Sequence, residues 1–276
     1  MLPLFYLWFY FYIPDVREVV IMDFIISANT DIGITKDTNQ DGLSIKVLDT
    51  PYGKMIFAVL CDGMGGLSKG EVASTTVVSA FNDWVYNELP ALCKTGITDS
   101  AIRNQWEDIV FKQNRIISSY GASQGVRLGT TVVVMLITQT RFYIMNIGDS
   151  RAYEISDTIH QLTEDQTVVA REIKLGKLTP EEAKTDSRRN VLLQCIGASD
   201  NIYPDMFFGD PKKNAVYMLC SDGFRHEITS DEIYEKFQPD ILKNTDIMYE
   251  KAEQLIELNK QRSEQDNISV ALIKTI

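Results

Sequence analysis

The sequence is poor in the residues that build zinc and disulfide sites. It has four cysteines and two histidines among 276 residues, and no two cysteines stand in a C-x-x-C pair. A structural zinc site takes its ligands from cysteine and histidine at such spacings, so none is expected. Cysteines this sparse and unpatterned fit a reducing compartment, and we expect a cytoplasmic location.

Positive charge is also scarce. The chain carries 27 lysines and arginines against 38 aspartates and glutamates, which gives a formal net charge of −11 at pH 7. Nucleic acid requires a basic face, as does an anionic membrane surface, so neither is an expected partner. A phosphorylated substrate would have to be attracted locally, most simply by bound cations that reverse the negative field.

Long apolar runs are missing as well. The N-terminal segment "LPLFYLWFYFYI" has twelve uncharged residues, fewer than the roughly 18 that suggest a membrane span. It lacks the basic start and the small-residue cleavage site of a signal peptide. Two interpretations stay open: a weak anchor to a membrane or partner, or a translation start placed too early, with Met22 opening the folded protein. We favour the second, and expect residues 1–21 to be an extension before one domain of residues 22–276.

Hydrophobic periodicity predicts groups of strands that are each followed by helices. The expected strands cover 23–28, 43–48, 55–61, 130–138, 141–148, 215–220 and 267–276, and the expected helices 69–88, 99–119, 167–175 and 246–260. Two capping-box sequences, Thr179 with Glu182 and Thr229 with Glu232, mark the starts of two more short helices. No long linker, low-complexity tract or internal repeat interrupts the chain, so we expect one layered α+β domain.

Four aspartates stand at the ends of apolar runs. Asp62, Asp149 and Asp222 follow "MIFAVLC", "RFYIMNIG" and "AVYMLCS", and Asp266 precedes "NISVALI". In an antiparallel sheet the end of one strand lies at the same edge as the start of its neighbour, so the four carboxylates can meet at one rim. Taken singly, "DG" and "GDS" are common turn sequences, and a turn is the ordinary interpretation of each. Their repetition, without histidine or cysteine nearby, favours an oxygen-ligand site for Mg²⁺ or Mn²⁺.

Eight segments, read in order, resemble the successive motifs of the metal-dependent (PPM) protein phosphatases, the protein phosphatase 2C family. They are "DIGITKDTNQD", "CDGMGG", "LGTT", "GDSRAY", "LTEDQTVV", "RRNVLLQCIG", "CSDGF" and "QDNISVALI". The resemblance covers about residues 24–276, and the "DGMGG" form looks like the bacterial branch. It implies a central antiparallel β-sandwich flanked by helices on both faces, in α-β-β-α layers. It also implies a serine/threonine phosphoprotein phosphatase in which water, activated between two Mn²⁺ or Mg²⁺ ions, attacks phosphorus in line without a covalent intermediate.

The same resemblance implies roles for the aspartates. Asp62 would be catalytic and bridge both metal ions, and the carbonyl of Gly63 would bind one of them. Asp222 and Asp266 would complete the other site. Asp149 would help Asp222 to bind a third, weaker ion, as in bacterial members.

Four further positions of the site match the family or depart from it. Asp41, which closes "NQD", matches an acidic position beneath the metals that acts through water. Lys36 stands where family members usually carry an arginine that binds substrate phosphate; a lysine attracts phosphate as a point charge, or is simply a solvated surface residue. Gln40 replaces a glutamate. Met64 replaces the histidine thought to be the general acid of animal relatives; because a thioether donates no proton, leaving-group protonation would fall to a metal-bound water, and Met64 can also be packing.

The polar stretch 163–200 matches the variable flap beside the family's active site. Its "SRRN" either meets acidic or phosphorylated substrate segments or is solvated. The implied partners are phosphorylated proteins of a cognate serine/threonine kinase, and we expect a monomer with no stable membrane insertion. Two other functions stay open: a catalytically weak or inactive relative that binds phosphoproteins, and a phosphatase of small phosphate esters or of phosphotyrosine.

Overall fold

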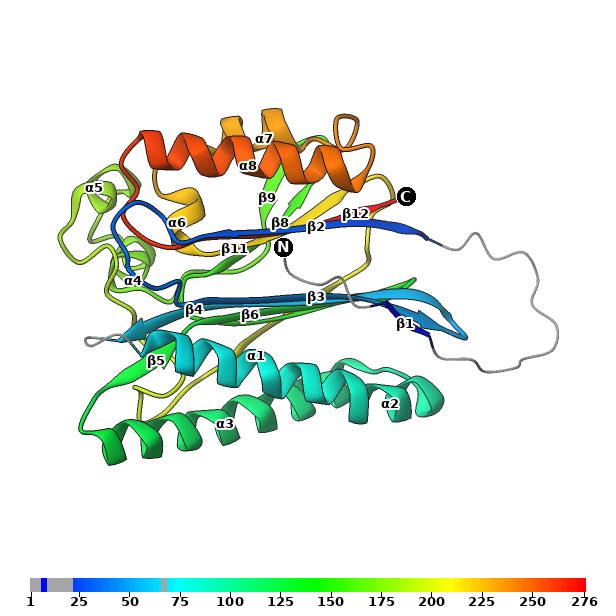
Figure 1. Cartoon of the computed structure of the whole chain (residues 1–276), viewed down its shortest axis with the longest axis horizontal. Coiled ribbons are helices and arrows are strands. Elements are labelled where there is room, and N and C mark those ends of the chain that lie inside the picture. The colour runs from blue at the N-terminus through cyan, green and yellow to red at the C-terminus, as the bar shows by residue number, and fades with distance from the viewer. Residues whose placement is uncertain (1–5, 9–21, 66–68) are drawn as a thin grey trace.

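The structure is a computed structural model that describes residues 6–8, 22–65 and 69–276. Two β-sheets stack face to face, and helices cover the outer face of each, so that the layers run α-β-β-α (Figure 1). The layered α+β architecture expected from the sequence is therefore present.

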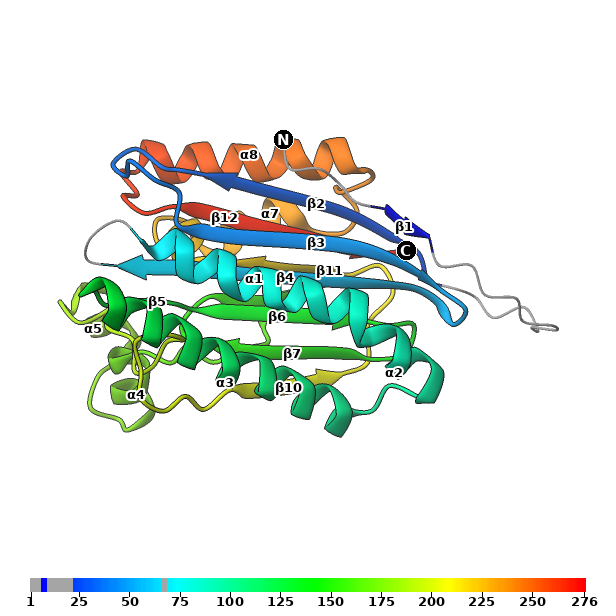
Figure 2. The same cartoon turned by 60° about the horizontal axis from the view of Figure 1, so that its bottom comes forward.

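The larger sheet has the strand order β1-β3-β4-β6-β7-β10, and β5 pairs with β4 beside this path. Its strands are β1 (Tyr6–Trp8), β3 (Asp41–Thr50), β4 (Gly53–Gly65), β5 (Leu128–Thr130), β6 (Val132–Ile137), β7 (Phe142–Ile147) and β10 (Asp205–Gly209). Helices α1 (Gly70–Asn87), α2 (Leu89–Thr95) and α3 (Asp99–Gln124) cover its outer face (Figure 2).

The smaller sheet has the order β2-β12-β11-β8-β9. Its strands are β2 (Phe24–Asp31), β8 (Arg151–Ile155), β9 (Ile159–Gln161), β11 (Val216–Cys220) and β12 (Ile268–Thr275). Helices α6 (Asp222–Arg225), α7 (Ser230–Phe237) and α8 (Thr245–Gln261) lie on its side of the sandwich, and α4 (Val168–Lys174) and α5 (Pro180–Thr185) lie at one end of it (Figure 1).

Strand β4 shows how the core is built. Its side chains alternate, so that Phe57, Val59 and Cys61 pack under the helices of the larger sheet, whereas Ile56, Ala58 and Leu60 face the space between the sheets. A strand buried on both faces reads as a continuous apolar run, which is what the sequence shows. Cys61 therefore lies on the opposite face from Asp62, as strand alternation predicts.

The expected helix starts are confirmed. The side chain of Thr98 caps α3 by accepting a hydrogen bond from the Ala101 N–H at 3.2 Å, and capping boxes open both α5 and α7. The sequence pattern missed α2 and α6, because helices of seven and four residues span too few turns to show a helical period.

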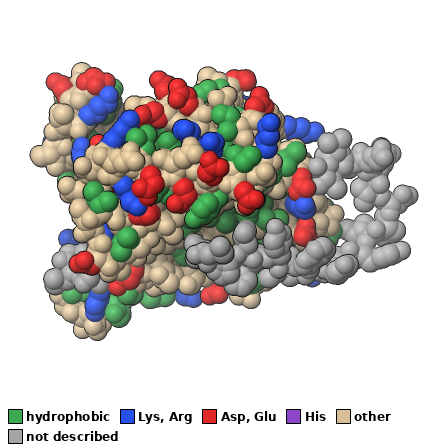
Figure 3. Space-filling view, turned by 45° about the horizontal axis from the view of Figure 1, so that its top comes forward, with side chains coloured by type: hydrophobic (Ala, Val, Ile, Leu, Met, Phe, Trp, Pro, Cys, Tyr) green, Lys and Arg blue, Asp and Glu red, His purple; other side chains and the backbone are tan. Residues whose placement is uncertain are grey.

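The N-terminal extension contributes one described segment. Strand β1 pairs in parallel with β3, with Tyr6 opposite Val47, so three residues of the segment expected to precede the fold join the sheet edge. Residues 1–5 and 9–21 lie outside the described part of the chain, and the proposed translation start at Met22 stays a prediction. Among the described helices, none is long and apolar enough to cross a bilayer. Acidic and basic side chains are interspersed over the face shown in Figure 3.

Candidate metal centre

The aspartates singled out from the sequence lie at or next to the starts of β3 and β12 and the ends of β4, β7 and β11, and Figure 1 shows α4, α5 and α6 at this end of the sandwich (left). Asp41 and Asp62 are direct partners in the β3–β4 register. Asp149 lies in the turn between β7 and β8, where the chain passes from one sheet to the other. Asp222 begins α6, separated from the end of β11 by Ser221, and Asp266 lies two residues before β12. The rim that sequence reasoning placed on neighbouring strands is thus shared by both sheets.

The carboxylates act on one another electrostatically. Burial raises the pKa of Asp62 well above its ordinary value, and the negative charges of Asp222, Asp41, Asp266 and Asp149 raise it further. Burial also raises the pKa of Asp41 to about 7; the hydroxyls of Ser269 and Ser221 act against this shift, and the charges of Asp222 and Asp266 add to it. For Asp149, burial raises the pKa to about 7, the charge of Asp222 adds to the effect, and the charge of Arg225 acts against it. The five side chains therefore lie in one cluster, in which Arg225 offsets part of the charge at Asp149.

Several oxygens of this cluster are unsatisfied. Both carboxylate oxygens of Asp41 and Oδ1 of Asp222 are buried and have no hydrogen-bond partner among the described residues. Buried polar atoms are normally paired, and a carboxylate without a partner is costly unless a cation compensates it. Hard oxygen donors without cysteine suit Mg²⁺ or Mn²⁺. The residues present therefore fit divalent ions.

The carboxylates of this cluster do not converge on one point as the ligands of a single ion. Within residues 22–65 and 69–276, no three histidine, cysteine, aspartate or glutamate side chains converge closely enough to hold an ion. Like charges drawn together without a cation repel one another.

Backbone hydrogen bonds hold Asp62 in place. Its N–H donates to Oγ1 of Thr131 at 3.0 Å, and its carbonyl accepts from the Thr131 N–H and from Oγ1 of Thr130, both at 2.9 Å. These contacts tie the end of β4 to the segment between β5 and β6. The "LGTT" sequence thus fixes the position from which the Asp62 side chain extends.

Gly63 is required by a close approach of two backbones. A Cβ at this position would lie 2.3 Å from the carbonyl oxygen of Gly70 and 2.5 Å from that of Gln40, so only glycine lets α1 begin here. With its amide nitrogen turned toward Gly63, Gln40 donates to the Gly63 carbonyl at 3.1 Å and accepts from the Gly70 N–H at 3.3 Å. A carbonyl oxygen has two lone pairs, so this bond leaves one for an ion.

A second close approach joins α6 to the start of β12. A Cβ on Gly223 would lie 2.3 Å from the carbonyl oxygen of Asn267 and 3.3 Å from the Cβ of Asp266. Because Gly223 directly follows Asp222, this contact brings the two aspartates of the smaller sheet together. The glycine of "SDG" therefore allows Asp222 to lie close to Asp266, and does not only form a turn.

His226, which the sequence reasoning did not assign, lies beside Asp222. Its Nε2 is 3.5 Å from Oδ2 of Asp222, and its Nδ1 is 3.5 Å from Oε2 of Glu264. Burial acts to lower the pKa of His226, but the hydrogen bond to Glu264 and the charge of Asp222 outweigh it and raise the pKa. The sequence feature that could have identified His226 is its position four residues after Asp222, one helical turn away.

The side chain of Lys36 contacts the aspartate cluster. Its Nζ lies 2.9 Å from Oδ1 of Asp266, with the lysine side chain 39% exposed. Partial burial acts to lower the pKa of Lys36, but the bond to Asp266 and the charges of Asp62 and Asp222 raise it overall. Lys36 is therefore a cation in contact with the aspartates, and its part in phosphate binding stays a prediction.

Asn267, a second residue that sequence reasoning missed, holds the loop that carries Lys36. Its Oδ1 accepts from the Gln40 N–H at 2.9 Å, and its Nδ2 donates to the carbonyls of Ile32 at 2.9 Å and Thr38 at 3.3 Å. The available signal was an amide directly after Asp266, at the opening of an otherwise apolar strand.

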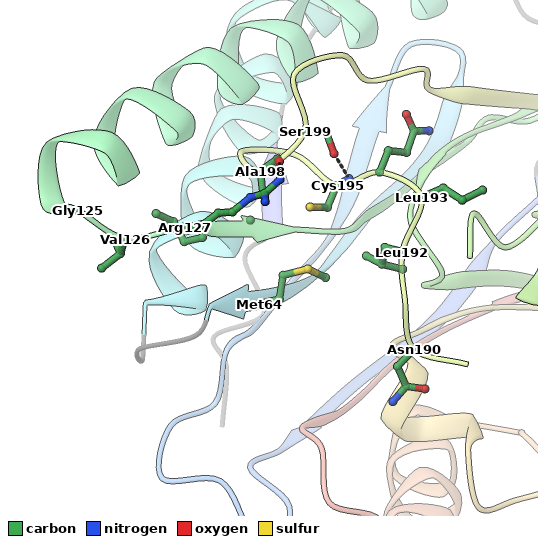
Figure 4. A pocket seen from close by; sticks show the side chains of 13 residues that line it. Met64, Gly125, Val126, Arg127, Asn190, Leu192, Leu193, Cys195, Ala198 and Ser199 are labelled. Atoms are coloured by element: carbon green, nitrogen blue, oxygen red, sulfur yellow. Dashed lines mark hydrogen bonds between the residues drawn. The ribbon is translucent and has the colours of Figure 1, made fainter. Parts of the chain in front are cut away.

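A pocket of about 660 Å³ opens beside Met64 (Figure 4). Met64 stands two residues beyond Asp62 in β4 and points toward Leu192 of the flap across the pocket. The full lining is Met64, Gly125, Val126, Arg127, Leu128, Gly129, Asn190, Leu192, Leu193, Gln194, Cys195, Ala198 and Ser199. Residues between 190 and 199 of the stretch 163–200 therefore line this pocket together with Met64. Arg188 of "SRRN" pairs with Asp186 of the same stretch at 2.7 Å, which favours its interpretation as a solvated residue.

Comparisons with known proteins agree with this geometry. The family model described as protein phosphatase 2C matches residues 34–258. The protein phosphatase PhpP of Streptococcus pneumoniae is 32% identical over 251 residues, which are 90% of this chain and 96% of that protein.

Two solved structures share the fold. The serine/threonine phosphatase of S. agalactiae superposes with a TM-score of 0.76 at 28% identity, over 91% of this chain and 99% of that one. The catalytic domain of the phosphatase PstP, in complex with two manganese ions, superposes with a TM-score of 0.74 at 25% identity, over 92% and 99%.

These findings confirm the fold class and the enzyme class expected from the motifs, a protein-serine/threonine phosphatase. The match contains Asp41, Asp62, Asp149, Asp222 and the flap, and it ends before Asp266. The chain belongs to the protein phosphatase 2C family.

Proposed function

We propose that the aspartate cluster is the active centre, and that it hydrolyses phosphoserine and phosphothreonine in proteins with the help of two divalent ions, Mn²⁺ or Mg²⁺. Asp62, the carbonyl of Gly63, Asp222 and Asp266 would hold these ions. The observation that carries the proposal is the set of buried carboxylate oxygens without partners at the shared rim. When bound, such ions lower the pKa of water and neutralise phosphoryl oxygens. The manganese in the PstP structure supports this choice of metal.

The chain's own residues would bind and orient the substrate. Lys36 presents an ammonium group at the aspartates, where it attracts the phosphate as a point charge. Asp41, beneath Asp62 in the β3–β4 ladder, would accept hydrogen bonds from water with its two unpaired oxygens. Met64 donates no proton, so its contribution is to form the wall of the pocket.

The pocket beside Met64 supports a protein substrate over a small ester. Its apolar wall, which includes Val126, Leu192 and Leu193, offers contact area to residues that flank a phosphoserine or phosphothreonine. A free phosphate ester has no such residues. We further propose that the substrates come from a serine/threonine kinase, and that the chain acts as a monomer in the cytoplasm.

The proposal is tested by hydrolysis assays on matched substrates. A phosphothreonine peptide, the same peptide with phosphotyrosine, and a small phosphate ester are compared with added Mn²⁺ and after chelation. We expect Mn²⁺-dependent turnover with the phosphothreonine peptide preferred, and loss of turnover in Asp62→Asn. Full activity in chelated enzyme would contradict the metal role. Metal binding without turnover of any substrate would favour the inactive, phosphoprotein-binding alternative.

A further inference from the structure

A buried arginine lies against Asp149, the aspartate expected to help bind a third ion. Nη2 of Arg225 donates a hydrogen bond to the backbone carbonyl of Asp149 at 3.0 Å and lies 3.7 Å from its carboxylate Oδ2. The side chains of Arg225 and Asp149 are 11% and 7% exposed. At this distance and burial, the two charges are screened little by solvent.

Arg225 belongs to a group whose charges already balance. Its Nη2 also lies 3.6 Å from Oδ2 of Asp165, and Arg151 holds Asp165 with two hydrogen bonds of 2.7 and 2.6 Å. Two guanidinium groups therefore face two carboxylates. A divalent ion added here would leave an excess of positive charge among buried side chains, which is costly.

The neighbouring part of the cluster carries an excess of negative charge. Asp41, Asp62, Asp222 and Asp266 act on one another, and Lys36 and His226 are the cationic side chains that contact them in the described ion pairs. Four carboxylates here outnumber the available cations, and three of their oxygens are buried without partners. The excess of negative charge is thus at Asp41, Asp62, Asp222 and Asp266, and not at the group formed by Arg225, Arg151, Asp149 and Asp165.

The place of Arg225 in the chain explains how it reaches Asp149. Helix α6 runs from Asp222 to Arg225, so the arginine stands three residues after Asp222, on the same face of that turn. Nε of Arg225 is buried and has no hydrogen-bond partner within the described residues. A guanidinium held with one donor unsatisfied is kept there chiefly by the charges of Asp149 and Asp165, not by a complete set of hydrogen bonds.

From this arrangement we propose that Arg225 takes the place of a third divalent ion at Asp149, so that the chain binds two ions and not three. The inference rests on the proposed function, because it presupposes the two ions at Asp62, Asp222 and Asp266. It replaces the third, weaker site that the family resemblance implied. Asp149 is then a partner of Arg225 and not a metal ligand.

The number of bound ions tests the inference. Calorimetric titration of the full chain with Mn²⁺ is expected to give two ions for the wild type and three for Arg225→Gln, which removes the positive charge. Arg225→Lys keeps a positive charge and is expected to remain at two ions. Arg103→Gln, an exposed arginine of α3 paired with Glu107, is the control for the loss of a surface charge. Three ions in the wild type, or two in a folded Arg225→Gln, would overturn the inference.

A second measurement does not depend on the stability of the variant. Crystals of the wild type soaked in saturating Mn²⁺ are expected to show anomalous density at Asp62 and Asp222 and none at the carboxylate of Asp149. A manganese peak bound to Asp149 would overturn the inference while leaving the proposed function intact. A wild type that binds no manganese at all would contradict both, so the two failures are distinguishable.

Discussion

Asp41 and Asp62 lie directly opposite each other across the antiparallel pair of β3 and β4. Directly opposed side chains in such a pair are close neighbours on the same face of the sheet, and like charges in these positions are destabilising. By hydrogen-bond geometry neither oxygen of Asp41 has a partner among the described residues, and although the hydroxyls of Ser269 and Ser221 act to lower the pKa of Asp41, burial and the charges of Asp222 and Asp266 raise it overall. We interpret the pair as part of a cation-binding site.

The stability of the metal-free chain should fall as the pH rises. The pKa of Asp41 is raised from 3.8 to about 7 by burial, so the folded chain binds this proton more tightly than the unfolded chain does. The contribution is fully present below about pH 4 and is lost as the pH rises through about 7, on the order of 2–4 kcal/mol. Urea unfolding in the presence of a chelator, between pH 5 and 8, measures it.

Manganese and Asp41→Asn provide the controls for this pH effect. Mn²⁺ should stabilise the chain more at pH 8 than at pH 5, because the ions compensate the ionised carboxylates. Asp41→Asn should flatten the pH dependence in chelator, whereas Asp157→Asn, an exposed aspartate, should leave it unchanged. If the metal-free chain instead becomes more stable toward pH 8, repulsion between the ionised carboxylates does not destabilise the fold.

Lys36→Ala should weaken phosphate capture. The ammonium group lies at the aspartates, and a hydrogen bond to a charged group is worth about 1.5–3 kcal/mol, so kcat/KM for a phosphothreonine peptide should fall roughly tenfold to a hundredfold. Lys36→Arg should retain most of the activity, since it restores a positive charge with a bidentate donor. Steady-state kinetics at saturating Mn²⁺, with exposed Lys243→Ala as the control, measure the change. Unaltered kinetics in Lys36→Ala would mean that the residue is a surface lysine.

Leu193→Ser should reduce the preference for peptides over small esters. Leu193 lines the pocket beside Met64 and is 43% exposed, and burying a leucine side chain contributes about 1.5–3 kcal/mol. The ratio of kcat/KM for the phosphothreonine peptide to kcat/KM for p-nitrophenyl phosphate should therefore fall about tenfold. Leu175→Ser, which is 58% exposed outside the pocket, is the matched control. An equal ratio in both variants would remove the pocket from substrate binding.

Local signals in the sequence were sufficient for much of the fold. Thr179 and Thr229 each begin a helix as the capping boxes predicted, because a cap depends on residues within one turn. The alternation of β4 and the placement of aspartates at strand ends are also local features. Both features are present in the structure, where the element boundaries are only slightly shifted from the predicted ones.

The features that sequence reasoning missed depend on contacts between distant segments. The bond from Arg225 to Asp149 spans 76 residues, and the bond from Asn267 to Gln40 spans 227. Neither has a periodic signature, and each requires the relative position of the two sheets to be known. For the same reason, sequence reasoning placed the four aspartates on one sheet edge, whereas both sheets contribute to it.

A crystal structure determined with Mn²⁺ tests the central claim most directly. The account predicts two anomalous peaks about 3.5–4 Å apart, with Asp62 between them and Asp222 and Asp266 completing the ligands. Separate peaks on distant surfaces, or an empty rim at saturating Mn²⁺, would contradict it.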